Sequence, residues 1–586
     1  MTKQHLLRIF IMILFIPAML LQGCWLSPAE FDIPAEPVVS PERILPPSEI
    51  PSTHIPSEPG KFSLRYDSNS PINPITSLNR DNILLSSLLY ESLFILDSSL
   101  KAEPLLCEKW STSDNITFTF ELKPDIAMSD GSLLTADDVV YSIKQSMLAG
   151  RFINRFKSIA SITSDEELTV IISLTAPNSR FINLLDVPII KNGSVNRRIP
   201  PGTGPYIFVE IELEPEVDPE NQVDPDAEAD DETESGTEPV INTETGAEPG
   251  VENDIKIETM WLEPFPQHRD YANMPIPIVH LRECDDSELT ELFDDGELSL
   301  LWDDPSDAFD IRINRLPEKH FYNTTALQFI GFNARKGIMG DSDIRRAIAC
   351  SIDRQYITDN IFTAQEAVAS PLALSPAFGL YDTQWEQRRL DPLVEMALLL
   401  DSALLVDCDD DSYLELTDGL GGYEEITVDF IVNIENTHRT QAAHKIADTL
   451  WRIGFNITVR ELPWDTYLEA LQKGDFDMYY GEVVLNADFD LSPLLLPGSN
   501  LNYGGTCSTE YIPFVADFLA ARSDREIRFA AERLCNEISV YAPFAPVLYK
   551  KYAMYVPMGA VSNAAPSQSS VFYNFSSWKF DMTMLT

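Results

Sequence analysis

The stretch that decides the fold is residues 129–139, with the sequence SDGSLLTADDV. Asp130 and Gly131 favour a tight turn, because glycine adopts positive φ angles without steric cost. Thr135 is a good helix N-cap, and two aspartates follow it in the first turn, where the helix dipole favours anions. The stretch therefore predicts a turn that leads directly into a helix over residues 136–147.

Segments on both sides of this turn alternate between strand and helix patterns. Period-two alternation and β-branched or aromatic residues predict strands at 61–66, 117–122, 426–432 and 455–461. Amphipathic spacing predicts helices at 341–351 and 438–453. Strands that alternate with helices indicate an α/β fold, and a chain of 586 residues is long enough for two or more domains.

The N-terminus has the features of an exported lipoprotein. A positively charged start and an apolar run over 9–21 precede Gly23 and Cys24. The run is shorter than the roughly 20 apolar residues of a membrane-spanning helix. A small residue followed by Cys here resembles the lipobox of bacterial lipoproteins, in which the thiol is linked to diacylglycerol and the leader is cut before it. The alternative is an ordinary secretory leader in which Cys24 has no such role.

We therefore expect residues 1–24 to be a lipoprotein signal peptide and Cys24 to carry the lipid anchor. The mature protein would then lie on the extracytoplasmic face of the cell membrane, attached through acyl chains.

Two further segments have non-globular compositions. Residues 25–60 are rich in proline and poor in apolar residues, which predicts an extended tether. Residues 210–254 are dominated by Glu and Asp, so like-charge repulsion and the lack of apolar residues predict a disordered surface insertion. The flanks at 206–209 and 255–258 have strand patterns, and the insertion is therefore predicted to expand a hairpin turn. It is either a solubilising loop, a region that attracts divalent cations, or a spacer against the cell wall.

The charge and the motifs of the chain argue against several functional classes. The net charge of -50 argues against nucleic acid as a partner. The sequence has no HExxH, no GxSxG and no phosphate-binding glycine loop, so we expect no enzymatic activity, no cofactor and no metal site. Acidic residues over 407–415 have the spacing of a calcium loop, although Ser412 stands where glycine is expected, and calcium binding stays an alternative.

The order of motifs along the chain resembles the extracytoplasmic solute-binding proteins of ABC transporters, family 5, the group that binds oligopeptides, dipeptides or nickel. The stretch 129–139 is similar to the most specific signature of that family. Further stretches that are similar to family motifs, in the same order, lie at 90–93, 104–110, 202–206, 332–333 and 343–354.

The resemblance implies a two-lobed fold of the periplasmic-binding-protein type, class II, with an extra subdomain in lobe one and a hinge of two β-segments. Lobe one would span 61–326, lobe two 327–550, and residues 551–586 would return to lobe one. The hinge segments would lie near 328–332 and 548–555. Solute would be enclosed between the lobes by hinge closure.

The resemblance also implies a site for the solute in the segment 481–493. Peptide-binding members hold the ligand ammonium with an Asp in such a segment, and Asp488 is the best match, with Asp490 second. A desolvated carboxylate makes a strong charge-assisted hydrogen bond with an ammonium group. The alternative is that both are turn or capping residues. Glu482 stands where the family has Trp, and the spacing differs from the family pattern.

Other residues near this segment are predicted to stack on or enclose the ligand, although core packing is the alternative for each aromatic one. Together with Asp488 and Asp490, the predicted ligand-binding residues are Trp464, Tyr480, Glu482, Asn502 and Tyr503.

The expected function is that of a monomeric receptor. It would capture a peptide or similar small solute and deliver it to the permease subunits of an ABC importer. The alternative is a surface sensor or interaction protein on the same fold that no longer serves transport.

Overall fold

The computed structural model describes most of the chain after the predicted tether. The described ranges are 61–211, 259–304, 313–387, 392–418, 420–505 and 510–585. Cys24, the predicted signal peptide, the predicted tether, positions 212–254 of the acidic insertion and the predicted strand 255–258 lie outside these ranges. No helix within them combines the length and the apolar content that a membrane crossing requires.

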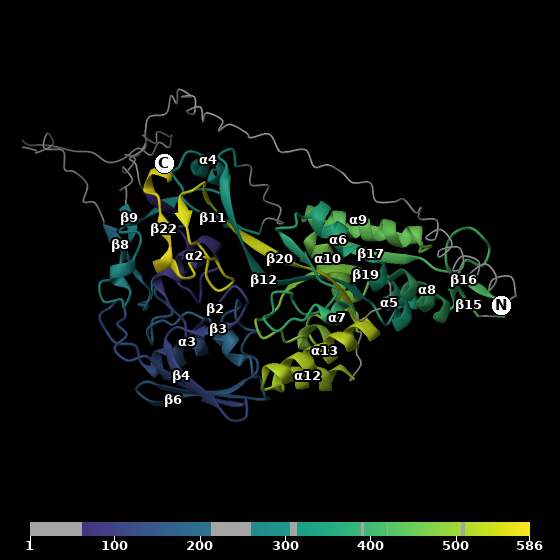
Figure 1. Ribbon diagram of the computed structural model, residues 1–586, viewed down its shortest axis with the longest axis horizontal. Coiled ribbons are helices and arrows are strands. Elements are labelled where there is room, and N and C mark those ends of the chain that lie inside the picture. Colours follow the sequence, from purple (N-terminus) through teal and green to yellow (C-terminus); the bar gives the residue numbers. More distant parts are fainter. Residues whose placement is uncertain are drawn as a thin grey trace, which may run out of the picture. The chain divides into compact units, whose positions relative to one another are not determined.

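The largest sheet has seven strands, in the order β11-β20-β12-β19-β17-β18, with β13 paired to β20. Its strands are β11 (Leu301–Asp303), β12 (Pro317–Phe332), β13 (Ala367–Ala369), β17 (Val428–Asn433), β18 (Ile457–Leu462), β19 (Met478–Val484) and β20 (Phe544–Pro557). The long strands β12 and β20 run antiparallel, side by side (Figure 1). They contain both predicted hinge segments, which are therefore strands as expected; their role as a hinge stays a prediction.

Helices cover both faces of this sheet where its strands are parallel. β17 is parallel to β18 and to β19, which requires crossover connections. α9 (Thr437–Arg452) connects β17 to β18, and α10 (Trp464–Lys473) connects β18 to β19. α9 buries Ala442 and Ile446 on one face, and α10 buries Tyr467 and Leu471 on the other. Covering from both sides explains why β17 is apolar at four of its six positions and buried at five of them.

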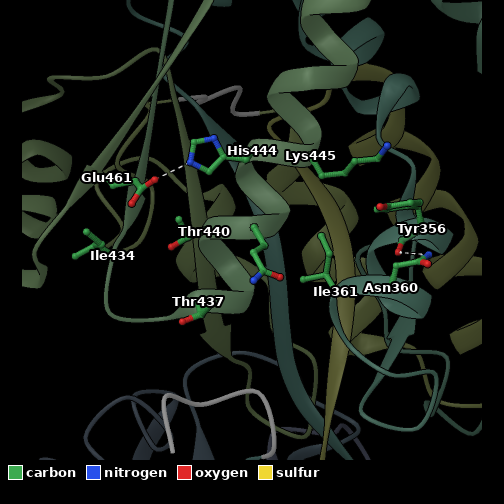
Figure 2. A pocket seen from close by; sticks show the side chains of 10 residues that line it. Tyr356, Asn360, Ile361, Ile434, Thr437, Thr440, His444, Lys445 and Glu461 are labelled. Carbon is green, nitrogen blue, oxygen red and sulfur yellow. Dashed lines mark hydrogen bonds and ion pairs between the residues drawn. The ribbon is translucent and has the colours of Figure 1, made fainter. Parts of the chain in front are cut away.

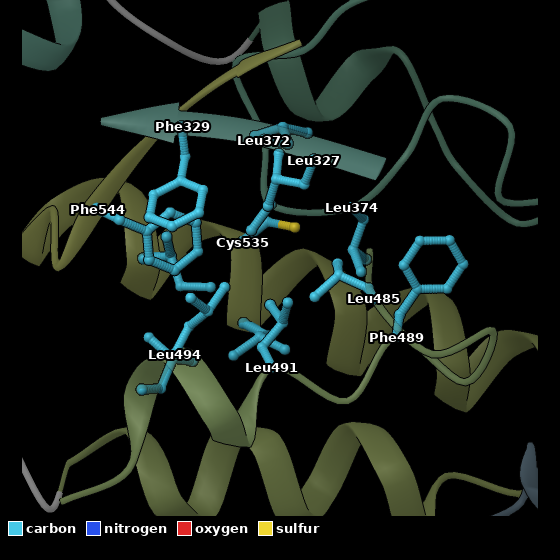
Figure 3. Close-up of a cluster of buried hydrophobic side chains, with 14 of the residues drawn as sticks. Leu327, Phe329, Leu372, Leu374, Leu485, Phe489, Leu491, Leu494, Cys535 and Phe544 are labelled. Atoms are coloured by element: carbon cyan, nitrogen blue, oxygen red, sulfur yellow. The ribbon is translucent and has the colours of Figure 1, made fainter. Parts of the chain in front are cut away.

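The other helices pack around these sheets or close loops between them. They are α2 (Arg80–Leu89), α3 (Ala136–Leu148), α4 (Leu289–Asp294), α5 (Ser342–Ser351), α6 (Arg354–Tyr356), α7 (Gln384–Gln387), α8 (Pro392–Ser402), α11 (Ser492–Leu495), α12 (Tyr511–Ala520) and α13 (Asp524–Tyr541). Apolar side chains of α12 and α13 form part of the cluster shown in Figure 3 and cover the face opposite α9.

Two four-stranded sheets are built from the first half of the chain. One has the order β1-β10-β9-β8 and the other β4-β5-β7-β6. Their strands are β1 (Phe62–Tyr66), β4 (Cys107–Thr112), β5 (Thr117–Leu122), β6 (Ile159–Glu166), β7 (Thr169–Leu174), β8 (Tyr206–Ile211), β9 (Thr259–Pro264) and β10 (Val279–Glu283). β8, which contains the predicted strand 206–209, pairs antiparallel with β9, so the two ends of the acidic insertion lead into a hairpin. The other predicted flanking strand, 255–258, lies outside the described residues.

Short strands complete the described structure in three small sheets. They are β2 (Phe94–Leu96) with β3 (Ala102–Pro104), β14 (Leu405–Val406) with β15 (Glu415–Thr417) and β16 (Tyr423–Glu425), and β21 (Val561–Ser562) with β22 (Lys579–Phe580).

The turn and helix predicted from residues 129–139 are confirmed. Gly131 has a φ of 83°, and Asp130 accepts a hydrogen bond from the Ser132 amide at 3.0 Å. Thr135 caps α3 in a capping box with Asp138, whose carboxylate accepts the Thr135 amide at 2.9 Å. The predicted α/β class is confirmed as well.

Candidate functional site

The carboxyl ends of β17, β18 and β19 lie at one edge of the seven-stranded sheet, because the three strands are parallel. The chain leaves β17 toward one face through α9. It leaves β19 toward the other face, where Leu485 and Phe489 join the apolar cluster of Figure 3. In open α/β sheets, ligands bind in the crevice where neighbouring strands send their connections to opposite faces. This edge is therefore the candidate site.

Three apolar side chains at this edge are exposed to solvent. Ile434, Trp464 and Val484 are 47%, 51% and 59% exposed, and they stand at or just beyond the ends of β17, β18 and β19. The Trp464 ring stacks on that of Tyr467, with 5.9 Å between ring centroids. Exposed apolar groups that converge at a switch point are typical of ligand contact surfaces. We call these three residues, with Arg439 and Glu482, the carboxyl edge.

Two helices begin at the carboxyl edge. The Asn436 side chain caps α9 by accepting the Arg439 amide at 2.9 Å. Glu435 accepts the Trp464 amide at 2.9 Å at the start of α10, and this hydrogen bond lowers the pKa of Glu435. Both helices thus direct the positive ends of their dipoles to the edge, where they favour an anionic group.

A network of buried polar groups lies behind the edge. Glu482 accepts Gln328 Nε2 at 2.8 Å and forms an ion pair with Lys550 Nζ at 2.9 Å. Lys550 is 3% exposed and also pairs with Asp304. Burial lowers the pKa of Lys550, but Glu482 and Asp304 outweigh burial and hold this pKa above its ordinary value. Tyr480 completes the network by donating its hydroxyl to Gln328 Oε1 at 2.8 Å.

Arg439 faces this network from the first turn of α9. Its Nε atom is buried, has no hydrogen-bond partner among the residues described, and lies 4.0 Å from Glu482 Oε2. A buried donor without an acceptor is unfavourable and rare in folded proteins. The sequence interpretation missed Arg439. One signal was available, since a basic residue in the first turn of a helix opposes the helix dipole.

An open pocket of about 530 Å³ adjoins the carboxyl edge along the outer face of α9 (Figure 2). Ile434 belongs to both. The pocket is lined by His444, which pairs with Glu461 at 2.6 Å, and by Lys445, whose ammonium lies 4.0 Å from the centre of the Tyr356 ring. The edge therefore continues into a polar groove that has room for the remainder of a small solute.

Comparison with known proteins identifies the family. The family model of bacterial extracellular solute-binding proteins, family 5 Middle, matches residues 101–220 and 257–503. The chain belongs to this family.

Relatives of this family 5 protein are similar over most of their length. The periplasmic murein peptide-binding protein MppA of Escherichia coli (strain K12) is 21% identical over 520 residues, which is 85% of this chain and 89% of MppA. The periplasmic oligopeptide-binding protein OppA of Salmonella typhimurium is 23% identical over 490 residues, 80% of this chain and 82% of OppA.

A solved structure shows the same fold. The ABC transporter substrate binding protein CtaP of Listeria monocytogenes superposes with a TM-score of 0.64 at 18% identity, over 89% of this chain and 99% of CtaP. The predicted two-lobed fold of class II is thereby confirmed. The chain is an extracytoplasmic solute-binding protein, as its family is.

The structure places Asp488 away from solvent. Its Oδ2 atom accepts Asn178 Nδ2 at 2.8 Å, and its side chain is 3% exposed. Burial, together with the charge of the neighbouring Asp490, raises the pKa of Asp488 to about 6, although Asn178 and Arg180 oppose this shift. Asp490 accepts the Ser492 amide at 2.9 Å, beside the start of α11. That either carboxylate binds a solute ammonium stays a prediction.

The remaining predicted residues fall into two places. Tyr480 is fully buried beneath the carboxyl edge. Asn502 and Tyr503 lie beside the end of β12, where the Gly504 carbonyl accepts the Ala334 amide at 3.0 Å. Since β12 is antiparallel to β19, its end adjoins the start of β19, at the opposite end from the carboxyl edge. The structure thus brings Trp464 and Glu482 to one edge and leaves Asn502 and Tyr503 outside it.

The acidic residues with calcium-loop spacing lie on a surface loop. Carboxylate oxygens of Asp407, Asp409 and Glu415 are within 4.8 Å of one another. Glu415 also accepts the Cys408 amide at 2.6 Å. Calcium binding by this loop stays an untested alternative.

Proposed function

We propose that this protein is a lipid-anchored extracytoplasmic receptor that binds a peptide or a similar zwitterionic solute at the carboxyl edge and delivers it to an ABC importer. Two of the predicted ligand-binding residues, Trp464 and Glu482, are retained in this proposal, and Arg439 is added to them.

The observation that carries the proposal is the position of Arg439 Nε, which is buried without a hydrogen-bond acceptor among the residues described and lies 4.0 Å from Glu482 Oε2. The buried cluster contains two cations, Arg439 and Lys550, and two anions, Glu482 and Asp304. A solute with one anionic and one cationic group adds no net charge to this balanced cluster, which keeps the desolvation cost low. A solute carboxylate or carbonyl would satisfy Arg439, and a solute ammonium would approach Glu482.

The apolar part of the carboxyl edge supports a peptide-like solute. Ile434, Trp464 and Val484 supply contact area for side chains, while strand ends supply main-chain groups that an extended peptide can use. MppA and OppA are named for murein peptide and oligopeptide binding, which supports the same class of solute. The comparisons do not favour a sensor that has lost transport.

A thermal-shift screen tests the solute class. Protein without residues 1–24 is mixed with a library of di- to pentapeptides, and a bound peptide raises the stability by RT ln(1 + [L]/Kd). We expect a shift with at least one peptide, reduced in Arg439→Ala and Glu482→Gln. Arg452→Ala, in the last turn of the same helix and 66% exposed, is the matched control and should keep the shift. No shift with any peptide, or equal shifts in Arg439→Ala and Arg452→Ala, would contradict the proposal.

The lipid anchor has a separate test. Cells that express the full chain should incorporate a labelled fatty acid into the protein, and Cys24→Ala should abolish the label and release the protein from the membrane fraction. Equal labelling of the two proteins would contradict the anchor.

A further inference from the structure

The seven-stranded sheet and the β4-β5-β7-β6 sheet each pack against a hydrophobic cluster of their own. Each of these two parts of the chain also contributes one buried apolar side chain to the cluster of the other part. Leu100, in the turn between β2 and β3, belongs to the cluster under the seven-stranded sheet, and Ala487, just after β19, belongs to the cluster of the other sheet. Among the buried residues described, each is the only member of its cluster from that part of the chain. The two clusters are therefore joined by a reciprocal exchange.

One short segment, residues 178–183, binds both exchanged residues and their neighbours. Asn183 Nδ2 donates to the Leu100 carbonyl and to the Ala487 carbonyl, each at 3.1 Å. Arg180 Nε donates to the Asp488 carbonyl at 2.9 Å. Asn183 and Arg180 are buried, so these hydrogen bonds are shielded from water.

Arg180 extends the contact to α12. Its Nη1 atom donates to the Phe518 carbonyl at 3.1 Å, and its guanidinium lies 3.7 Å from the centre of the Phe518 ring. Burial lowers the pKa of Arg180 to about 10, although Asp488 and Asp490 oppose this shift. The segment 178–183 thus forms hydrogen bonds both with the loop after β19 and with helix α12.

The backbone is strained on both sides of the exchange. Leu100 has a φ of 61° and Phe489 has a φ of 55°, in the left-handed region that residues with a Cβ atom disfavour. Both side chains are buried, and the Phe489 ring packs edge-on against Phe378 at 5.4 Å. Strained residues persist only where surrounding contacts determine their conformation, and such strain marks functional elements. Here the strain at Leu100 and Phe489 favours breaking of the contact between the two clusters, and the hydrogen bonds made by residues 178–183 oppose that breaking.

We propose that Leu100, Arg180 and Asn183 are positioning residues that hold the loop after β19, residues 485–490, and thereby set the solute affinity of the carboxyl edge. The loop begins directly after Val484, so its release displaces the end of β19 that carries Glu482. The affinity claim rests on the proposed function, whereas the holding of the loop does not.

Hydrogen exchange in solute-free protein tests the contact directly. We expect the amides of 485–490 to exchange at least tenfold faster in Leu100→Ala and in Asn183→Ala than in the unaltered protein. Leu404→Ala is the matched control, because Leu404 also has a left-handed backbone, with a φ of 58°, but is 47% exposed on a surface turn. In Leu404→Ala, the amides of 485–490 should exchange at the same rate as in the unaltered protein. Asn183→Ala keeps both exchanged side chains and therefore remains informative if Leu100→Ala folds poorly.

Solute affinity is then measured with the peptide that gives the largest thermal shift, and we expect Kd to rise at least fivefold in Asn183→Ala. Unchanged exchange in both variants overturns the proposal. Faster exchange with an unchanged Kd overturns the positioning role. If the unaltered protein binds no peptide while exchange still rises, the proposed function fails and the holding of the loop stands.

Discussion

Two carboxylates near the end of β19 lie in opposite electrostatic environments. Glu482 is flanked by the cations Lys550 and Arg439 and accepts a hydrogen bond from the Gln328 side-chain amide. Asp488 is enclosed, accepts the Asn178 side-chain amide and the Asp490 backbone amide, and lies beside the Asp490 carboxylate; burial and that neighbouring charge raise its pKa to about 6. The motif directed attention to Asp488, whereas Glu482 is the carboxylate that has two cations beside it. A carboxylate's neighbours, more than its place in a motif, decide its role.

The largest effect should come from removing the ammonium that pairs with both Glu482 and Asp304. In Lys550→Met, the carboxylates of Glu482 and Asp304 lose the buried Lys550 ammonium, and we expect a loss of about 3–5 kcal/mol in the free energy of unfolding. Urea denaturation measures this loss. Lys473→Met is the control, because Lys473 pairs with Glu469 at an exposed site and should cost less than about 1 kcal/mol. Equal losses in the two variants would remove the contrast between the environments.

The pH dependence of stability should separate Asp488 from Glu482. Burial raises the pKa of Asp488 from 3.8 to about 6 in the folded state, so the folded protein binds the proton more tightly than the unfolded chain does. The native state is therefore favoured below pH 4 and loses this advantage as the pH rises through 6. Relative to Asp488→Asn, the unaltered protein should lose about 2 kcal/mol between pH 4 and pH 7. A difference between the two proteins that is constant over this range would show that Asp488 has an ordinary pKa.

A smaller effect, on binding alone, should come from Trp464→Ala. Trp464 is 51% exposed, so its removal should weaken peptide binding about tenfold and change the unfolding free energy by less than about 1 kcal/mol. Isothermal titration measures the affinity. Trp451→Ala is the control, since Trp451 is 56% exposed at the other end of α9. If both variants bind as the unaltered protein does, the carboxyl edge does not contact the solute.

The smallest effect should come from Asp490→Asn. The charge of Asp490 raises the pKa of Asp488, so its removal should move the Asp488 titration to lower pH without unfolding α11, because an Asn side chain still accepts the Ser492 amide. The midpoint of the stability profile reports this shift. A midpoint that stays in place would mean that burial alone raises the pKa of Asp488.

Local parts of the fold could be predicted from the sequence because their determinants are local. The Asp130–Gly131 turn and the Thr135 cap act within a few residues of α3, and the hairpin around the acidic insertion joins two neighbouring strands. The strand order of the seven-stranded sheet could not be predicted in this way. β12 pairs with β20, and most of the predicted lobe two lies between these two strands in the sequence. Such long-range pairings depend on packing that no local pattern encodes.

The site could be predicted only in part for the same reason. Trp464 and Glu482 were predicted to bind the ligand because they lie in or near the family segment 481–493, and the structure places both at the carboxyl edge. Arg439 was missed because its significance comes from a contact with a distant strand. The burial of Asp488 could not be predicted either, since its hydrogen-bond partner Asn178 is 310 residues away along the chain.

The most direct test of the central claim is a crystal structure of the protein with a bound peptide. The account predicts a peptide carboxylate or carbonyl at hydrogen-bond distance from Arg439 Nε, about 3 Å, and a peptide side chain against Trp464. A peptide that contacts neither residue, or one whose ammonium is held by Asp488 in place of Asn178, would contradict it.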